Sequence, residues 1–249
     1  MDWTFTDEQK MLRDMVRKFV NNELKPMAQK IDEEKSIPRE LIDKIAQLGL
    51  LGVAFPPEYG GAGMGEIGYC IMQEEIGRGC GSTATMIGAH QSIGASGIYM
   101  FGTEEQKQKY LVPLCEGSKI GAYALTEANA GSDAFNSETI AEDRGDHYLV
   151  NGRKLFITNG SFADIFTLFV NVDDGSGRNK ETALIVEKDL EGFSVGKIEE
   201  KMGIRGSETA ELVLEDVKVP KENVLGREGR GFIVGMKVLN TGRLGLGAA

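Results

Sequence analysis

Apolar residues recur every three or four positions through most of the first 119 residues, the spacing that places them on one face of a helix. A stripe over residues 12–20 follows a capping-box sequence at residues 6–9, and a second capping box at residues 103–106 opens a later helix. Residues 82–100 are rich in Ala, Gly, Ile and Met and predict a buried helix that another helix or a ligand can approach closely. We therefore expect an N-terminal α-helical domain over residues 1–119.

Short runs of β-branched and aromatic residues, separated by turn sequences, replace this pattern near residue 120. The predicted strands are residues 120–126, 147–151, 154–158, 166–172, 182–186, 210–214 and 217–219. Asn151-Gly152 stands between two of these runs and is typical of a two-residue hairpin. Because no helical segment separates the strands, the pattern predicts an antiparallel β-barrel or sandwich as a middle domain over residues 120–228.

Helical spacing returns at Phe232, after a glycine-rich link at residues 226–231. The last residues still form an apolar helix, and no C-cap or polar ending precedes Ala249. We interpret residues 229–249 as the start of a C-terminal helical bundle. The bundle is incomplete in this sequence, either because the sequence is cut inside the helix or because the chain is a naturally short relative. The predicted fold class is thus α+β, with a helical domain, an antiparallel β-domain and the first helix of a bundle.

The composition is that of a soluble globular protein, with 41% hydrophobic and 27% charged residues. A net charge of −10 disfavours nucleic acid as a partner, because phosphate binding needs a basic face. No stretch approaches the roughly 20 apolar residues of a membrane-spanning helix. The acidic start of the chain also differs from a signal peptide. We expect a cytoplasmic protein with no membrane partner.

The cysteines and histidines suggest no reactive or metal-binding cluster. Cys70, Cys80 and Cys115 are widely spaced and odd in number, which supports neither a disulfide framework nor a zinc site. No metal is predicted, and buried thiols in a reducing compartment are the favoured interpretation. His90 and His147 are isolated, so nothing supports a hydrolase triad.

Two short segments carry candidate chemistry. Over residues 123–133 a predicted strand ends in a turn of small residues, where Thr126 and Ser132 add hydroxyls and backbone N–H groups could meet a diphosphate or a ring edge. Taken alone, a polar surface turn is the favoured alternative. In the next strand, Phe156 and Thr158 share one face and could contact a planar cofactor. Taken alone, a core position for Phe156 is favoured.

Arg243 lies on the apolar final helix, where a cation needs an anionic partner. That partner is either a ligand phosphate or a carboxylate of the chain itself. The glycines at residues 60–65 follow no predicted strand, so a dinucleotide-binding loop is rejected there.

Eight motifs in order along the chain resemble the acyl-CoA dehydrogenase family, and the resemblance covers essentially the whole sequence. They lie at residues 57–61, 101–107, 110–114, 125–133, 151–154, 156–160, 201–205 and 224–232. The sequence is most similar to the short-chain, butyryl-CoA-type members. The family implies a helical domain, a β-domain and a C-terminal four-helix domain.

The resemblance also implies FAD as the cofactor and an acyl-CoA as the substrate. The implied cofactor-binding residues are Tyr123, Leu125, Thr126, Gly131, Ser132, Phe156, Ile157 and Thr158. The implied substrate-binding residues are Ser132, Asn240, Thr241, Gly242 and Arg243, and residues 82–100 correspond to the floor of the acyl pocket. This sequence departs from the family at Ala128, usually Pro, and at Asn240, usually Asp, which removes a possible charge partner for Arg243.

The implied reaction is α,β-dehydrogenation of a fatty acyl-CoA in fatty acid β-oxidation, with electrons passed to an electron-transferring flavoprotein. A carboxylate base removes the α-proton while hydrogen bonds to the thioester carbonyl acidify the α-carbon. The family's base is a Glu in the C-terminal domain, so we expect it beyond Ala249 and assign no catalytic residue. A homo-oligomer, dimer or tetramer, is expected of the complete protein. Two alternatives stay open: an acyl-CoA oxidase or flavin monooxygenase on the same scaffold, and a catalytically incomplete FAD- or CoA-binding subunit.

Overall fold

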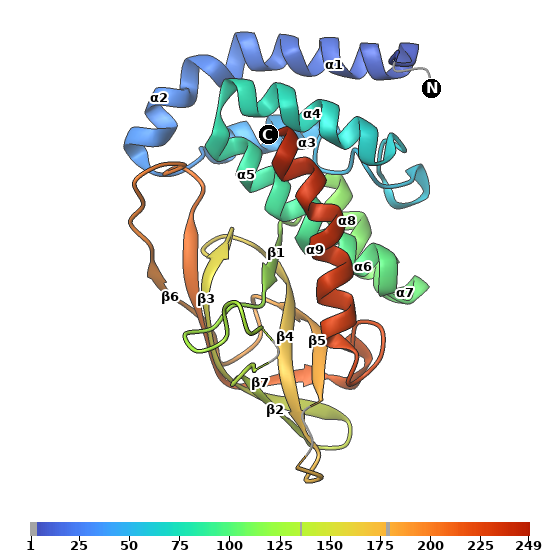
Figure 1. The fold of residues 1–249 in the computed structure, drawn as a ribbon, viewed down its shortest axis with the longest axis vertical. Helices are drawn as coiled ribbons and strands as arrows, with labels where there is room; N and C mark the ends of the chain where they lie inside the picture. The colour runs from blue at the N-terminus through green and yellow to red at the C-terminus, as the bar shows by residue number, and fades with distance from the viewer. Residues whose placement is uncertain (1–3, 135, 178–179) are drawn as a thin grey trace.

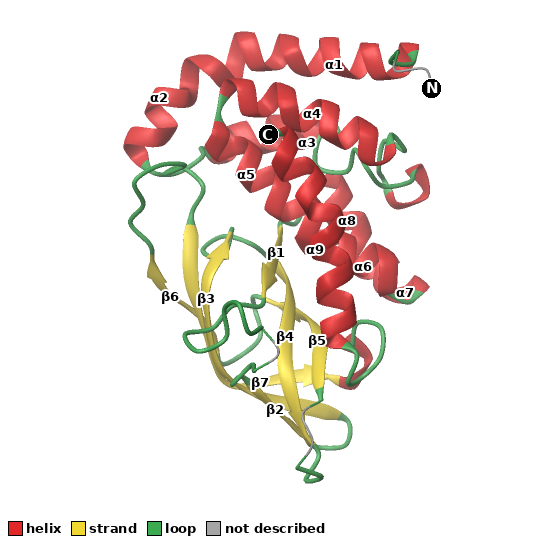
Figure 2. Cartoon of the chain, in the orientation of Figure 1, coloured by secondary structure: helices red, strands yellow, loops and turns green. Residues whose placement is uncertain are grey.

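The computed structural model describes residues 4–134, 136–177 and 180–249. A layer of helices lies above a curled sheet, and the last helix, α9 (Gly231–Ala248), runs from beside the sheet to the helical layer (Figure 1). Helices and strands are segregated along the chain, with the strands following the first eight helices (Figure 2). The predicted α+β class, a helical domain followed by a β-domain, is confirmed.

Among the described residues, eight α-helices precede the first strand and form the helical layer. They are α1 (Asp7–Phe19), α2 (Lys25–Glu34), α3 (Arg39–Gln47), α4 (Gly65–Gly79), α5 (Gly81–Gly88), α6 (Ser96–Phe101), α7 (Glu104–Gln106) and α8 (Val112–Glu116). Both predicted capping boxes are present. The Thr6 hydroxyl accepts from the Gln9 amide while the Gln9 side chain accepts from the Thr6 amide, and Thr103 and Gln106 do the same. These bonds satisfy N–H groups that a first helical turn leaves free.

The buried helix predicted over residues 82–100 forms as α5 and α6, joined without a break by the π-helical segment Ala89–Ala95. It packs directly on the sheet. A Cβ atom on Gly94 would lie only 2.8 Å from the Gly121 carbonyl carbon, so the glycine permits the close approach. The Thr167 hydroxyl donates to the Gly94 carbonyl at 3.1 Å. The helix and the sheet therefore share one boundary, along which the functional residues lie.

The sheet is mixed, and the prediction of a purely antiparallel sheet is wrong. Its strands are β1 (Gly121–Ala124), β2 (Ile140–Asp143), β3 (His147–Thr158), β4 (Ile165–Asp173), β5 (Glu181–Glu187), β6 (Phe193–Ile198) and β7 (Thr209–Pro220). The order is β1-β4-β2-β3-β7-β6, with β5 also paired to β4. β1 and β2 both pair in parallel with β4, and the other pairs are antiparallel. The antiparallel prediction rested on short strands joined by turns, whereas β1 pairs in parallel with a strand that begins 44 residues later, with Gly121 opposite Ile165.

The Asn151-Gly152 hairpin prediction is also wrong. β3 runs through both residues as one strand, and its pairing with β7 shifts register between Val150 and Gly152. A Cβ atom on Gly152 would lie 2.6 Å from Thr139 Oγ1, so this glycine serves a β-bulge and a close backbone approach. The two runs predicted over residues 210–219 likewise form the single strand β7, and β2 and β6 were not predicted.

α9 packs on both layers through glycines. A Cβ atom on Gly245 would lie 2.1 Å from Tyr69 Cε1 on α4, and one on Gly235 would lie 2.9 Å from the Tyr123 hydroxyl on β1. Among the residues that the structure describes, no helix combines the length and the apolar character needed to cross a bilayer.

Candidate functional site

A cavity of about 440 Å³ lies where the ends of β1 and β3 meet the buried helix and α9. We call it the sheet-side cavity. Its walls contain every residue that the sequence predicted for the cofactor: Tyr123, Leu125, Thr126, Gly131, Ser132, Phe156, Ile157 and Thr158. The remaining wall residues are Ile93, Ala134, Met236, Leu239 and Arg243. The fold thus gathers two sequence segments, about 25 residues apart, around one space.

Phe156 reaches this cavity because the backbone of β3 departs from a regular strand. Its φ is 58°, and the β3–β7 pairing shifts register between Lys154 and Ile157. The ring is 59% exposed, whereas the neighbouring Ile157 is buried. The core position favoured for Phe156 taken alone is therefore wrong. A positive φ on a bulky residue is strained, and strain of this kind is concentrated at functional sites.

The polar groups of the sheet-side cavity are free to bind a ligand. The hydroxyls of Thr126, Ser132 and Thr158 form no hydrogen bond with any other residue described by the structure. The same holds for the backbone N–H groups of Gly131 and Ser132, and a Cβ atom on Gly131 would meet nothing within 4 Å. Adjacent unpaired N–H groups and hydroxyls suit an anionic or heteroaromatic ligand.

A buried ion pair fixes the two halves of this cavity together. Glu127, in the loop after β1, lies 2.5 Å from the Lys154 ammonium on β3. The Glu127 carboxylate also accepts hydrogen bonds from Ser137, Glu138 N and Thr139. Burial alone would raise the pKa of Glu127, but the Lys154 charge and these hydrogen bonds outweigh it and hold the pKa at about 2. The carboxylate is therefore charged and anchors the loop that carries Gly131 and Ser132.

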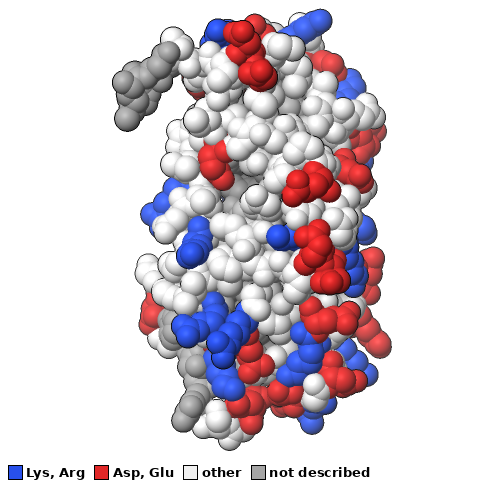
Figure 3. Space-filling model, turned by 90° about the vertical axis from the view of Figure 1, so that its right-hand side faces the viewer, with Lys and Arg blue, Asp and Glu red and all other residues white. Residues whose placement is uncertain are grey.

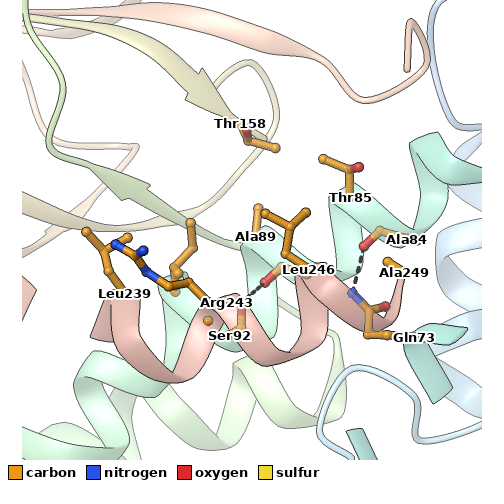
Figure 4. Close-up of a pocket in the computed structure, with 13 residues that line it drawn as sticks. Gln73, Ala84, Thr85, Ala89, Ser92, Thr158, Leu239, Arg243, Leu246 and Ala249 are labelled. Carbon is orange, nitrogen blue, oxygen red and sulfur yellow. Dashed lines mark hydrogen bonds between the residues drawn. The ribbon is translucent and has the colours of Figure 1, made fainter. Parts of the chain in front are cut away.

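A second cavity, of about 250 Å³, continues from the first between the buried helix, α4 and α9. We call it the helix-side cavity. It shares Ile93, Thr158, Leu239 and Arg243 with the sheet-side cavity. In Figure 4, Leu239 and Arg243 lie at one end, Thr158 lies above, and Gln73, Ala84 and Ala249 lie at the other end. Most of the wall is apolar, as a site for a hydrocarbon chain requires.

The predicted substrate-binding residues on α9 do not all face the same cavity. Arg243 lines both cavities, and Gly242 lines the helix-side cavity, where a Cβ atom would lie 2.9 Å from Ile93 Cγ2. Thr241 faces the other way, since its hydroxyl donates to Val238 O and the residue borders a small space beside Tyr69. Asn240 is exposed and borders none of these spaces. Within the described chain no carboxylate pairs with Arg243, so its guanidinium is available to a ligand anion.

Sequence reasoning did not assign four apolar wall residues to the sheet-side cavity: Ala134, next to the predicted turn, and the helical residues Ile93, Met236 and Leu239. The helical spacing of the last three is the same as that of core residues, so no sequence signal separates them. The pairing of Glu127 with Lys154 was not predicted either, although both residues lie inside motifs that resemble the family. A charged residue inside a strand pattern, as Lys154 is, was the available signal.

Among the described residues, His90 and the surface charges indicate no alternative site. His90 is buried, accepts from Gly121 N at 2.9 Å and donates towards the carbonyls of Leu51 and Leu114. Burial lowers its pKa to about 4, so it is a neutral structural link. On the face drawn in Figure 3, acidic and basic side chains are interspersed, more densely over the lower half, where the sheet lies. In the chain as described, no group of three potential ligands could hold a metal ion.

Comparison with known proteins gives two matches to family models. Residues 6–118 match the acyl-CoA dehydrogenase N-terminal domain, and residues 122–217 match the acyl-CoA dehydrogenase middle domain. Together they cover both layers of the fold described above.

Individual relatives are similar over the whole chain. It is 51% identical over 248 residues to a short-chain-specific acyl-CoA dehydrogenase of Clostridium acetobutylicum, covering 100% of this chain and 65% of that protein. A solved chain from work on the electron transferring flavoprotein of Acidaminococcus fermentans superposes with a TM-score of 0.96 at 46% identity, covering 100% and 65%. An acyl-CoA dehydrogenase from Bacillus anthracis, complexed with FAD, superposes with a TM-score of 0.91 at 41% identity, covering 98% and 41%. The chain spans 65% of the length of the curated relative.

Proposed function

This chain belongs to the acyl-CoA dehydrogenase family of oxidoreductases, and on that premise we propose that it binds FAD and a short-chain acyl-CoA for α,β-dehydrogenation. The observation that carries the proposal is the junction of the two cavities at Thr158 and Arg243. One cavity presents an exposed aromatic ring and free hydroxyls, and the other is mostly apolar. A flavin in the first would stand beside an acyl chain in the second.

The residues of the sheet-side cavity fit a flavin on three counts. The exposed Phe156 ring offers an apolar surface for a planar ring system. The hydroxyls of Thr126 and Thr158 offer hydrogen bonds to its edge, and the N–H groups of Gly131 and Ser132 offer them to a diphosphate. When bound, FAD would supply the acceptor for the two electrons that leave the acyl chain.

The acyl-CoA would enter by the same junction. The apolar wall of the helix-side cavity would desolvate the acyl chain, and the unpaired Arg243 would attract a CoA phosphate. Ser132, on the exposed turn, would contact the thioester arm. Exclusion of water from the cavity would strengthen every hydrogen bond to the thioester carbonyl and so favour loss of the α-proton. We assign the base to no residue of this chain.

The wider context is part of the proposal. We infer that residues 229–249 begin a third helical domain after domains over residues 1–119 and 120–228, and that the complete protein is a cytoplasmic homo-oligomer. We also infer that electrons pass to an electron-transferring flavoprotein, an inference supported by the similarity to the Acidaminococcus fermentans chain.

Titration of the FAD-free protein with FAD, followed by flavin fluorescence, tests the cofactor. We expect binding, and we expect Phe156→Ala to weaken it about tenfold, which corresponds to about 1.4 kcal/mol of lost ring contact. The matched control is Met202→Ala, because Met202 is fully exposed and lies away from both cavities. A protein that takes up no FAD contradicts the proposal.

Anaerobic addition of butyryl-CoA to the FAD-loaded protein tests the reaction. If the carboxylate base that removes the α-proton is present, we expect loss of the flavin absorbance band. Acyl-CoA binding alone should only shift that band. An unchanged spectrum at saturating butyryl-CoA would exclude the acyl-CoA assignment while leaving the FAD assignment intact.

A further inference from the structure

The last helix, α9, begins at Gly231 without a side-chain cap. Its N-cap residue, Arg230, makes no side-chain hydrogen bond to the first turn, whereas Ser, Thr, Asp or Asn at that position would fix where a helix starts. The helix begins directly on β5, because a Cβ atom on Gly231 would lie 2.8 Å from the Thr182 nitrogen. The position of α9 therefore depends on what holds the link that precedes it.

Glu228 anchors that link to three separate segments of the sheet domain. Among the described residues, its carboxylate accepts a hydrogen bond from the buried Tyr148 hydroxyl on β3 at 2.5 Å. The ammonium of Lys180, just before β5, lies 3.4 Å from Glu228 Oε1, and that of Lys221, just after β7, lies 3.9 Å from Oε2. The Lys221 ammonium also lies 3.8 Å from the centre of the Tyr148 ring. One carboxylate thus connects three strands to the start of α9.

The backbone on either side of Glu228 gives the link little stiffness of its own. Gly226 and Gly229 have φ values of 79° and 72°, a region that residues with a Cβ atom rarely adopt. The Gly229 amide donates to the Thr182 hydroxyl on β5 at 3.0 Å. Because glycine is conformationally permissive, the Glu228 side chain and this hydrogen bond fix the direction in which the chain enters the helix.

α9 carries cavity residues at a distance from this anchor. Met236, Leu239 and Arg243 lie in the wall of the sheet-side cavity, and Figure 4 shows the last two at one end of the helix-side cavity. Arg243 follows Gly231 by roughly three turns, or about 18 Å along the helix axis. The glycine contacts of α9 with the two layers limit how closely it packs, whereas the anchor at its start fixes its position along its own axis.

We propose that Glu228 is a positioning residue for acyl-CoA binding: by anchoring the start of α9, it sets where the Arg243 guanidinium lies at the junction of the two cavities. The inference rests on the proposed acyl-CoA function, in which Arg243 attracts a CoA phosphate. Glu228 itself borders neither cavity. Loss of the anchor should weaken acyl-CoA binding, because a displacement of about 1 Å spoils a charge-assisted contact. Flavin binding should change little, since the hydroxyls and N–H groups proposed for the flavin lie outside α9.

Dissociation constants of butyryl-CoA and FAD test this role. Butyryl-CoA is titrated into the FAD-loaded protein and followed by the flavin absorbance shift, and FAD is titrated into the FAD-free protein and followed by flavin fluorescence. Glu228→Ala should weaken butyryl-CoA binding about tenfold, as expected for loss of one hydrogen bond to a charged group. It should weaken FAD binding less than about threefold.

The matched control is Asp174→Ala. Asp174 lies 2.5 Å from the same Lys180 ammonium and is similarly exposed, 27% against 33% for Glu228, but it directly follows β4 and is not on the link to α9. Its substitution should change both affinities less than about threefold. An equal loss of butyryl-CoA affinity in Glu228→Ala and Asp174→Ala overturns the inference.

A double-mutant cycle separates positioning from a loss of stability. Arg243→Ala should itself weaken butyryl-CoA binding, and adding Glu228→Ala should then cause no further loss, because the group that Glu228 positions is gone. Two distant residues that act independently would instead give additive losses. Butyryl-pantetheine, which lacks the CoA phosphates, should bind the natural protein and Glu228→Ala equally. Additive losses, or an equal loss for butyryl-pantetheine, contradict the inference.

Tyr148→Phe provides a second variant in case Glu228→Ala does not fold. It removes only the hydroxyl that donates to Glu228 and keeps the buried ring. Its loss of butyryl-CoA affinity should also disappear in the Arg243→Ala background, and normal affinity in both anchor variants overturns the inference. A natural protein that binds no butyryl-CoA, or an Arg243→Ala variant that binds it normally, contradicts the proposed function itself, and the role of Glu228 falls with it.

Discussion

The ammonium of Lys154 lies 2.5 Å from Oε1 of Glu127, and their side chains are 0% and 4% exposed. This contact joins β3 to the loop that follows β1, and the Leu155 amide reinforces it by donating to the Thr126 carbonyl at 2.8 Å. Because Thr126 and Phe156 lie on the two joined segments, the width of the sheet-side cavity depends on this pair.

Replacement of Lys154 by Met should destabilise the protein by about 3–5 kcal/mol, because it leaves the Glu127 carboxylate buried without its cation. Urea unfolding at pH 7 measures the loss. The matched control is Arg153→Met, one residue earlier, which removes a 67% exposed partner of Glu211 and should cost less than about 1 kcal/mol. Equal losses in the two variants would contradict a special role for the buried pair.

The pKa of Glu127, held at about 2, predicts a loss of stability in acid. A carboxyl whose folded pKa is below its ordinary value of 4.5 stabilises the fold above pH 4.5 and loses that contribution as the pH falls through 2. Unfolding free energies measured between pH 5 and 2 should therefore fall more steeply in the natural protein than in Glu127→Gln. Parallel curves would show that Glu127 does not titrate in this range.

Glu181 has the opposite pH dependence. It is 3% exposed, neither carboxyl oxygen has a partner within the described chain, and burial raises its pKa to about 7, against the opposing charge of Lys154. A raised folded pKa means that stability is present below pH 4.5 and is lost as the pH rises through 7. Glu181→Gln should thus stabilise the protein at pH 8 by about 1–3 kcal/mol, and much less at pH 4.5. An equal gain in stability at pH 8 and at pH 4.5 would mean that the substitution acts through packing and not through the charge of Glu181.

Gly245→Ala should weaken the packing of α9 on α4. The added methyl would lie 2.1 Å from Tyr69 Cε1, and overpacking of this kind costs about 1–3 kcal/mol. Gly247→Ala is the control, because nothing lies within 4 Å of that methyl and Ala favours a helix by up to about 1 kcal/mol over Gly. The two substitutions should therefore change the urea midpoint in opposite directions. A stabilised Gly245→Ala would contradict the tight contact.

Much of the local structure could be predicted from the sequence. Both capping boxes form as expected, because their partners lie three residues apart. The change from helical spacing to short strands near residue 120 also marks the start of the sheet. Phe156 and Thr158 were expected on one face, and both do line the sheet-side cavity.

The predictions failed where a residue's role depends on a distant segment. Asn151-Gly152 has a hairpin sequence, but Gly152 is required by the approach of Thr139, and β3 continues through it. Phe156 leaves the core because a bulge against β7 reverses its backbone angle. Neither partner is visible from the local pattern.

The sequence by itself determined the helices, most of the strands and the set of polar and aromatic residues available for chemistry, since these follow from spacing over a few residues. Only the tertiary structure decided that the sheet is mixed and that Glu127 pairs with Lys154. The physical reason is that these features arise from contacts between segments far apart in the chain. Such contacts form only when the two layers pack, and hydrogen-bond and charge pairing then select among the arrangements that the local patterns allow.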